Sequence, residues 1–247
     1  MATLLDLEHK AEVTPSVAQL RNISEEYVRS GFVRKVYGIV AAQVALTALI
    51  SALCVYGPIA KVVLNFVAAY PRVVSWGSTG STLLALNALT VNQKKHPLNM
   101  YILGVFTLVV GSNVGIVCAA ASAAGFGFII LQAAVLTAAL VAGLTMYAFY
   151  TKRDFSFAGA TLFPCLFALS TYGLLALIFP LMRMDWAGFA CALAGAVLFC
   201  AYIVYDTFRV LHVLSPDNYV EAAIQLYLDI VNLFLHILEL LMKAKEK

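Results

Sequence analysis

Apolar residues along this chain are gathered into seven long runs separated by short polar segments. A helix needs roughly 20 such residues to cross the hydrocarbon core of a bilayer. Between Lys95 and Lys152 the chain contains no Asp, Glu, Lys or Arg, which leaves room for two crossings. The pattern predicts an all-α polytopic membrane protein, a bundle of seven transmembrane helices. The runs are Val36–Tyr56, Val73–Val91, Leu98–Ala121, Phe126–Tyr150, Phe155–Leu181, Ala187–Tyr205 and Tyr219–Leu241.

The second run is the least apolar of the seven. It contains SWGSTGST, and small polar residues of this kind suit close packing between helices better than contact with lipid. The segment before it, IAKVVLNFVAAYP, is too short to span a bilayer, and we expect it to lie along the membrane interface.

Composition supports this fold class and changes little else. Hydrophobic residues make up 62% of the 247 residues and charged residues only 12%, whereas soluble domains carry roughly 25% charged residues. We expect one domain at 33–242, preceded by a polar cytosolic tail at 1–32 and followed by a short basic tail at 243–247. The five cysteines all lie in apolar runs, and we expect them to be small buried hydrophobic residues.

Basic residues predict the orientation. A net charge of +3 is too small and too dispersed to indicate nucleic-acid binding. Most basic residues fall at loops that alternate helices would place on one side, which the positive-inside rule assigns to the cytosol together with the N-terminus. These are Arg29, Arg34, Lys35, Lys94, Lys95, Lys152, Arg153 and Arg209. The loops of the other side hold Lys61, Arg72 and Arg183, and the lysines of the C-terminal tail run against the rule.

The seventh run carries a stripe of polar residues. At about 100° per residue they fall within an arc of roughly 80° on an otherwise apolar helix. We call them the polar stripe: Glu221, Gln225, Asp229, Asn232, His236, Glu239 and Lys243. For Gln225, Asn232, His236 and Glu239, two interpretations stand: contacts between helices, or the lining of a pore.

Two aspartates stand out because they lie in or against apolar runs. Asp206 closes the sixth run, and Asp229 lies in the middle of the seventh. The loop between these runs is short, so their helices are expected to be antiparallel neighbours and the two carboxylates to approach each other. Such a pair would share a proton and titrate as one unit, which makes it a candidate pH sensor. Carboxylate oxygens also suit Ca²⁺, so transient Ca²⁺ binding at Asp206 and Asp229 is a further expectation.

Lys94 and Lys95 are candidate partners for Asp206. They stand at the expected cytosolic end of the second run. From there, an ammonium group could pair with the ionised carboxylate of Asp206, and the pair would break when that carboxylate takes up a proton. We call this role a latch. The other interpretation is that both lysines anchor the helix at the lipid headgroups.

Enzymatic functions fit the sequence poorly. Intramembrane aspartyl proteases carry YD on one helix and GxGD on the next, but the second acid here stands in LYLD, where bulky Leu226 and Leu228 replace the glycines. The GSTG segment has Thr79 where an intramembrane serine protease needs its nucleophile. We therefore expect no enzyme activity and no cofactor.

Several segments together resemble the Lifeguard branch of the transmembrane Bax inhibitor motif family. They are KKHPLN, GVFTL, YTKRDFSF, YIVYDT and SPDNYVEAAIQLYLDIVNLFLHIL, and the resemblance covers roughly residues 32–241. It implies six helices around a central C-terminal one. It further implies that Asp206 and Asp229 form a pH-sensing pair controlling a Ca²⁺ leak, with the latch at or near Lys95, a lysine where the family pattern has arginine.

The resemblance also implies a cellular role. Members of the family are linked to Ca²⁺ load in the endoplasmic reticulum or Golgi and to protection from cell death; the plasma membrane is a further alternative location. We therefore predict a pH-sensitive Ca²⁺ leak channel whose partners are the lipid bilayer and Ca²⁺. The alternative is a non-conducting regulator that binds other membrane proteins of cell-death control through its helices.

Overall fold

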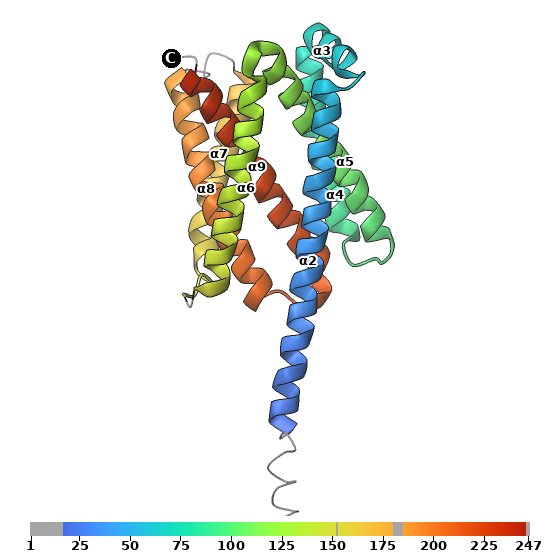
Figure 1. Ribbon diagram of the computed structural model, residues 1–247, viewed down its shortest axis with the longest axis vertical. Coiled ribbons are helices and arrows are strands. Elements are labelled where there is room, and N and C mark those ends of the chain that lie inside the picture. The colour runs from blue at the N-terminus through green and yellow to red at the C-terminus, as the bar shows by residue number, and fades with distance from the viewer. Residues whose placement is uncertain (1–16, 152, 180–184, 246–247) are drawn as a thin grey trace, which may run out of the picture.

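The structure is a computed structural model that describes residues 17–151, 153–179 and 185–245. All regular structure in these residues is helical, and Figure 1 shows the long helices side by side in one bundle. The elements are α2 (Val17–Tyr56), α3 (Ala60–Ala69), α4 (Pro71–Asn92), α5 (Leu98–Ala121), the π-helical turn η1 (Ser122–Phe126), α6 (Gly127–Tyr150), α7 (Ala158–Ile178), α8 (Asp185–His212), the 3₁₀ turn η3 (Pro216–Asn218) and α9 (Tyr219–Lys245).

Each predicted apolar run corresponds to one long helix, so the predicted fold class is confirmed. The largest differences are at two helix ends. α2 begins at Val17, within the segment predicted as a polar tail. The sixth helix is longer than its apolar run, because α8 continues past Asp206 to His212 and buries Val210 completely. Apolar side chains beyond Asp206 therefore extend the helix by more than a turn.

Five segments are long and apolar enough to cross a membrane. One of them, Leu98–Tyr150, has 53 residues and contains both α5 and α6. The chain reverses between these helices at Gly125, whose φ of 89° favours glycine over other residues. The two helices diverge from this turn (Figure 1), so the segment supplies two crossings.

α4 is not among the five apolar segments. This agrees with the small polar residues that make the second run the least apolar of the seven. Several of its hydroxyls donate to carbonyls of their own helix, including Thr82 to Ser78 at 2.9 Å. From α5, the amide of Asn113 donates to the Thr82 hydroxyl at 2.9 Å. The polar residues of α4 thus join it to α5. The preceding helix α3 is short, as predicted, and its place at a membrane interface stays a prediction.

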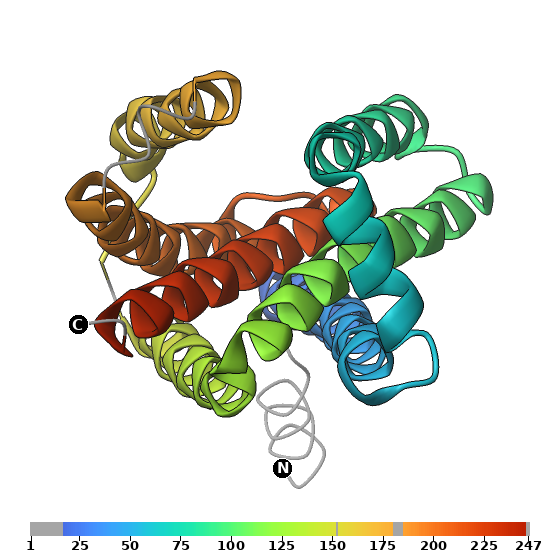
Figure 2. The same cartoon turned by 90° about the horizontal axis from the view of Figure 1, so that it is seen from above.

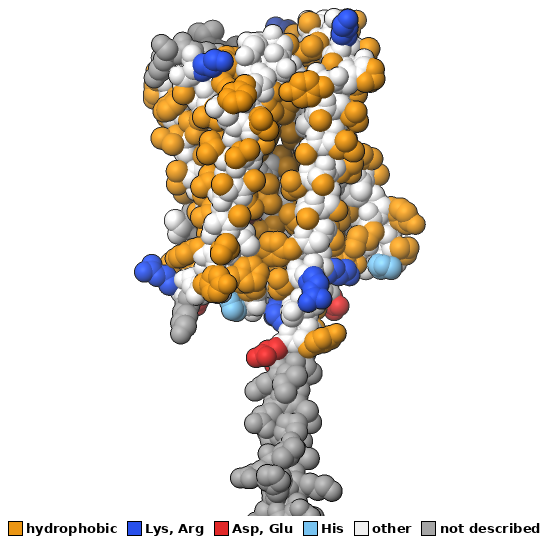
Figure 3. All heavy atoms as spheres, in the orientation of Figure 1, with side chains coloured by type: hydrophobic (Ala, Val, Ile, Leu, Met, Phe, Trp, Pro, Cys, Tyr) orange, Lys and Arg blue, Asp and Glu red, His pale blue; other side chains and the backbone are white. Residues whose placement is uncertain are grey.

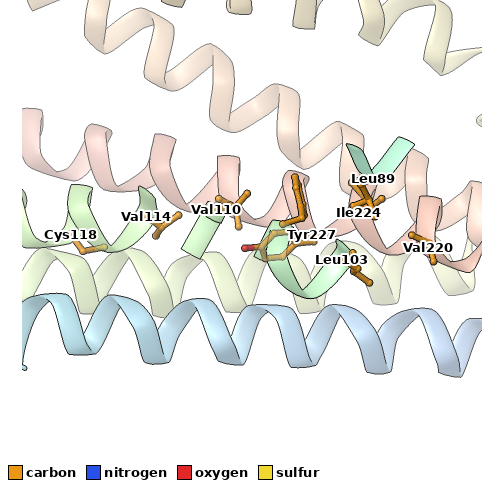
Figure 4. Packing of buried hydrophobic residues seen from close by; sticks show 10 residues of the cluster. Leu89, Leu103, Val110, Val114, Cys118, Val220, Ile224 and Tyr227 are labelled. Atoms are coloured by element: carbon orange, nitrogen blue, oxygen red, sulfur yellow. The ribbon is translucent and has the colours of Figure 1, made fainter. Parts of the chain in front are cut away.

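α9 lies at the centre of the bundle. It packs against α2, α5, α6 and α8, and Figure 2 shows it running between the other helices. It contributes residues to all three apolar clusters of the described chain: Tyr227 packs with α4 and α5, Leu226 with α2 and α8, and Leu233 with α6 and α8. Figure 4 shows the first of these clusters around Tyr227. A helix with protein on most sides has few positions facing lipid, which permits a polar stripe inside a membrane.

Charged side chains gather at the two ends of the bundle, and apolar side chains cover the face between them (Figure 3). At one end Arg29 of α2 donates to the carbonyls of Val210 and Leu214 at 3.2 and 2.6 Å. Lys35 lies 3.2 Å from the ring centroid of Tyr219. These contacts hold α2 against the turn between α8 and α9. Which end faces the cytosol stays a prediction.

Candidate functional site

The antiparallel packing of α8 and α9 brings Asp206 and Asp229 together. The two carboxyl groups lie within hydrogen-bonding reach of each other. They are only 5% and 6% exposed. Oδ2 of Asp229 is buried and meets no donor among the described residues. Two carboxyl groups can hydrogen-bond only if one of them carries a proton, because an ionised carboxylate is an acceptor alone. The geometry therefore suits a pair that shares one proton.

Arg209 is the basic residue at this pair. It stands one turn after Asp206 on α8, and its Nη1 lies 3.2 Å from Oδ1 of Asp206. The same nitrogen donates to Oε1 of Gln225 at 2.7 Å, and Nη2 donates to Oε1 of Glu221 at 3.4 Å. One guanidinium thus links α8 to the start of the polar stripe. It also separates the aspartates from the end of the bundle where α9 begins.

The acidic residues here do not form a ready-made metal site. Among the described residues, no three His, Cys, Asp or Glu side chains are grouped so that they could hold a metal ion. The oxygens of Asp206, Asp229, Glu221 and Gln225 are of the type that Ca²⁺ prefers, but Arg209 binds several of them. This arrangement suits an ion that passes or binds briefly while Arg209 moves away.

The rest of the polar stripe continues toward the far end of α9. Asn232 donates to the carbonyl of Leu228 in its own helix at 2.8 Å. His236 stacks on Phe199 of α8 with ring centroids 5.6 Å apart. Glu239 pairs with Lys243, one turn further on, at 3.5 Å. The polar edge of α9 therefore faces α8, and pore lining stays a prediction.

Comparison with known proteins shows the family. Residues 29–246 match the family described as "Inhibitor of apoptosis-promoting Bax1". The chain belongs to this Bax inhibitor family. It is 41% identical to Protein lifeguard 4 of Mus musculus over 221 residues, 90% of this chain and 88% of the mouse protein. It is 38% identical to the Golgi anti-apoptotic protein of Vaccinia virus (strain Lister) over 221 residues, 90% and 89% of the two chains. Protein LIFEGUARD 4 of Arabidopsis thaliana is 36% identical over 222 residues, 88% of this chain and 87% of the plant protein.

Family membership and the apolar helices together identify an integral membrane protein. The latch that the family resemblance implies, at or near Lys95, is not paired with Asp206 in the structure. In this Bax inhibitor family member, Lys95 lies in the turn just after α4, and its Nζ donates to Oδ1 of Asn92, the last residue of that helix, at 3.1 Å in an exposed position. Among the described side chains, Arg209 donates the hydrogen bond to Asp206. A latch at Lys94 or Lys95 stays a prediction.

Arg209 was missed as a site residue by the sequence reasoning, which used it only to predict orientation. A signal was present in the spacing Asp206-x-x-Arg209, because residues three apart on a helix are neighbours. Its contacts with Glu221 and Gln225 depend on how α8 and α9 pack. The sequence of either helix alone does not contain that information.

Proposed function

We propose that this Bax inhibitor family member is a pH-sensitive Ca²⁺ leak channel gated by protonation of Asp206 and Asp229. The observation that carries the proposal is the contact between two buried carboxyl groups on neighbouring helices. A pair of this kind has two charge states: both carboxylates ionised, or one proton shared between them. The packing of the neighbouring helices must differ between these two states, because ionised carboxylates repel each other and a shared proton joins the two groups.

The charge states suggest how the gate works. With one shared proton, α8 and α9 are held together and Arg209 balances the remaining negative charge. When the proton leaves, the second negative charge is stabilised either by Arg209 or by a divalent cation. Competition between the guanidinium and Ca²⁺ for the same oxygens makes the leak slow and dependent on pH. The chemistry requires no cofactor and no enzymatic step; the ligands are the bilayer and Ca²⁺.

The names of the relatives support a proposal for the cellular role. The vaccinia protein is named a Golgi anti-apoptotic protein, and the matched family is named for inhibition of an apoptosis-promoting protein. We place this chain in the Golgi or endoplasmic reticulum membrane with its N-terminus in the cytosol. There, a leak that lowers the stored Ca²⁺ would make the cell less sensitive to death signals.

Purified protein in Ca²⁺-loaded liposomes tests the proposal. Wild-type protein is expected to release Ca²⁺ at a rate that varies with pH, and Asp229→Asn is expected to change the rate and lose the pH response, since an amide exchanges no proton. Asp154→Asn is the control. Asp154 lies in the exposed loop between α6 and α7, where hydrogen bonds from the Ser156 backbone and side chain hold the pKa of its carboxyl below the ordinary value. This acid stays ionised across the tested range.

A non-conducting regulator of cell death is the second candidate function. It would act by binding other membrane proteins through the outer faces of its helices. α7 offers such a surface, since the most apolar stretch of this helix buries none of its residues within the described bundle. If wild-type protein and Asp229→Asn both behave like empty liposomes, the channel proposal is wrong and this alternative gains.

A further inference from the structure

A polar cavity lies between α7, α8 and α9, toward the end of α9 that is distant from Arg209. Its volume is about 500 Å³. Residues of α7 form one wall, which is mostly apolar and includes Ser170 and Tyr172. The opposite wall carries four of the seven residues of the polar stripe, namely Asn232, His236, Glu239 and Lys243, together with Cys191 of α8. Lipid cannot solvate these groups, and water is therefore the expected occupant of a cavity with this polar wall.

Two glycines of α8 make room for the polar stripe in this cavity. A Cβ at Gly195 would come within 2.5 Å of the His236 imidazole. A Cβ at Gly188 would collide with the side-chain nitrogen of Lys243. The glycines are seven residues apart and therefore lie on one face of α8. The close approach of α8 and α9 thus depends on glycine at the positions where the stripe carries its largest polar side chains.

Lys243 and Glu239 form an ion pair at the outer part of the cavity. Their charged groups are 3.5 Å apart, and their side chains are 27% and 42% exposed. Glu239 is the only acid that lines this cavity among the described residues, and Lys243 neutralises it. The polar stripe therefore has a basic side chain bound to an acid at each end: Arg209 on Asp206 and Glu221, and Lys243 on Glu239.

We propose that this cavity, toward the end of α9 that is distant from Arg209, is a water-filled vestibule for divalent cations. In it, Glu239 binds the cation and Lys243 competes with the cation for Glu239. This inference rests on the proposed leak function and adds a second control point to it. Asp229 lies ten residues before Glu239, about 15 Å along the helix, with Asn232 and His236 between them. A hydrated cation that displaces Lys243 from Glu239 would reach the aspartate pair along these side chains.

Thiol labelling tests the water in the cavity without any leak measurement. Two variants are compared, each with a single cysteine and alanine at the other four positions. One keeps Cys191, which lines the cavity. The other keeps Cys200, which is similarly half-buried on α8 but packs against an apolar cluster. A charged methanethiosulfonate reacts with hydrated thiolates, so Cys191 is expected to react at least about tenfold faster than Cys200. Equal or slower labelling of Cys191 would mean a dry cavity and would overturn the proposal.

Ca²⁺ release from liposomes tests the cation path. Lys243→Gln is expected to raise the leak rate several-fold, because Glu239 loses its competitor, and Glu239→Gln is expected to lower it. Lys245→Gln is the matched control, since Lys245 belongs to the same last turn but lies over the Phe126 ring, 5.7 Å from its centroid. If wild type leaks and none of the three variants differs from it, the vestibule proposal fails while the leak function stands. If wild type itself does not leak, the leak function fails, and rapid labelling of Cys191 would then identify a hydrated cavity without a conduction role.

Discussion

Arg209 and Asp206 form an ion pair within one helix, with Nη1 of the arginine 3.2 Å from Oδ1 of the aspartate. The arginine thus holds the carboxylate that faces Asp229. In the side chains that the structure describes, this guanidinium is the positive charge bound to the aspartate pair. It is therefore the group expected to set the pH at which the pair takes up its proton.

Arg209→Gln is expected to move the pH response of the leak toward higher pH. Loss of the positive charge disfavours the ionised pair, so protonation occurs at a lower proton concentration. A hydrogen bond to a charged group contributes about 1.5 kcal/mol, which corresponds to a shift of about one pH unit. The midpoint is measured from Ca²⁺ release across a pH series. Arg153→Gln, in the exposed loop after α6, should leave it unchanged; an unchanged midpoint in Arg209→Gln would remove Arg209 from the mechanism.

Lys95→Gln distinguishes a latch at Lys95 from control of the aspartate pair by Arg209. Because Lys95 binds Asn92 on exposed α4, its substitution is expected to change the midpoint far less than Arg209→Gln does. The same pH series gives the comparison. A shift as large as that of Arg209→Gln would instead support the latch predicted from the family resemblance. It would imply that α4 approaches Asp206 in another state of the protein.

The sequence was informative where one helix alone decides the outcome. Seven apolar runs predicted seven long helices, and the central place of the C-terminal helix was implied by the family resemblance. The approach of Asp206 to Asp229 was also predictable, because a short loop forces the sixth and seventh helices to be antiparallel neighbours. Hydropathy did less well at helix ends: runs such as TFRVLH mix polar and apolar residues, and packing decides whether they continue the helix.

Contacts between helices were the part that the sequence could not supply. Arg209 reaches Gln225 and Glu221 only because α8 and α9 pack at one particular rotation. The fit of His236 against α8 depends on Gly195 lying directly opposite it. Glycine is common throughout this chain, so nothing in the sequence distinguished Gly195 from glycines that face open space.

Gly195→Ala is expected to disturb the polar stripe at His236. The added methyl group cannot fit against the imidazole, so either His236 turns away or α8 and α9 separate. We expect the free energy of unfolding in detergent to fall by about 1 to 3 kcal/mol, as for other overpacked sites. We also expect slower Ca²⁺ release. Gly173→Ala is the matched control because Gly173 lines the cavity that contains His236 but has nothing within 4 Å of an added Cβ. Equal effects of the two substitutions would show that the contact at Gly195 is not limiting.

Tyr227→Phe tests the hydrogen bond that ties the central helix to α2. The Tyr227 hydroxyl lies 2.7 Å from Oγ1 of Thr47, and that threonine donates to the carbonyl of Gln43 in its own helix. The tyrosine is therefore the donor of the pair. Its ring is completely buried and packs edge-on against Phe106, a contact that phenylalanine retains. The substitution removes one buried hydrogen bond and little else.

The expected result is a loss of about 1 kcal/mol in the free energy of unfolding, since hydrogen bonds between membrane helices contribute modestly. Unfolding in mixed micelles with increasing sodium dodecyl sulfate measures it. Tyr101→Phe is the control, because that tyrosine is 71% exposed. If Tyr227→Phe unfolds like wild type, the hydroxyl of Thr47 must find another donor, and this hydrogen bond would not contribute to holding α9 against α2.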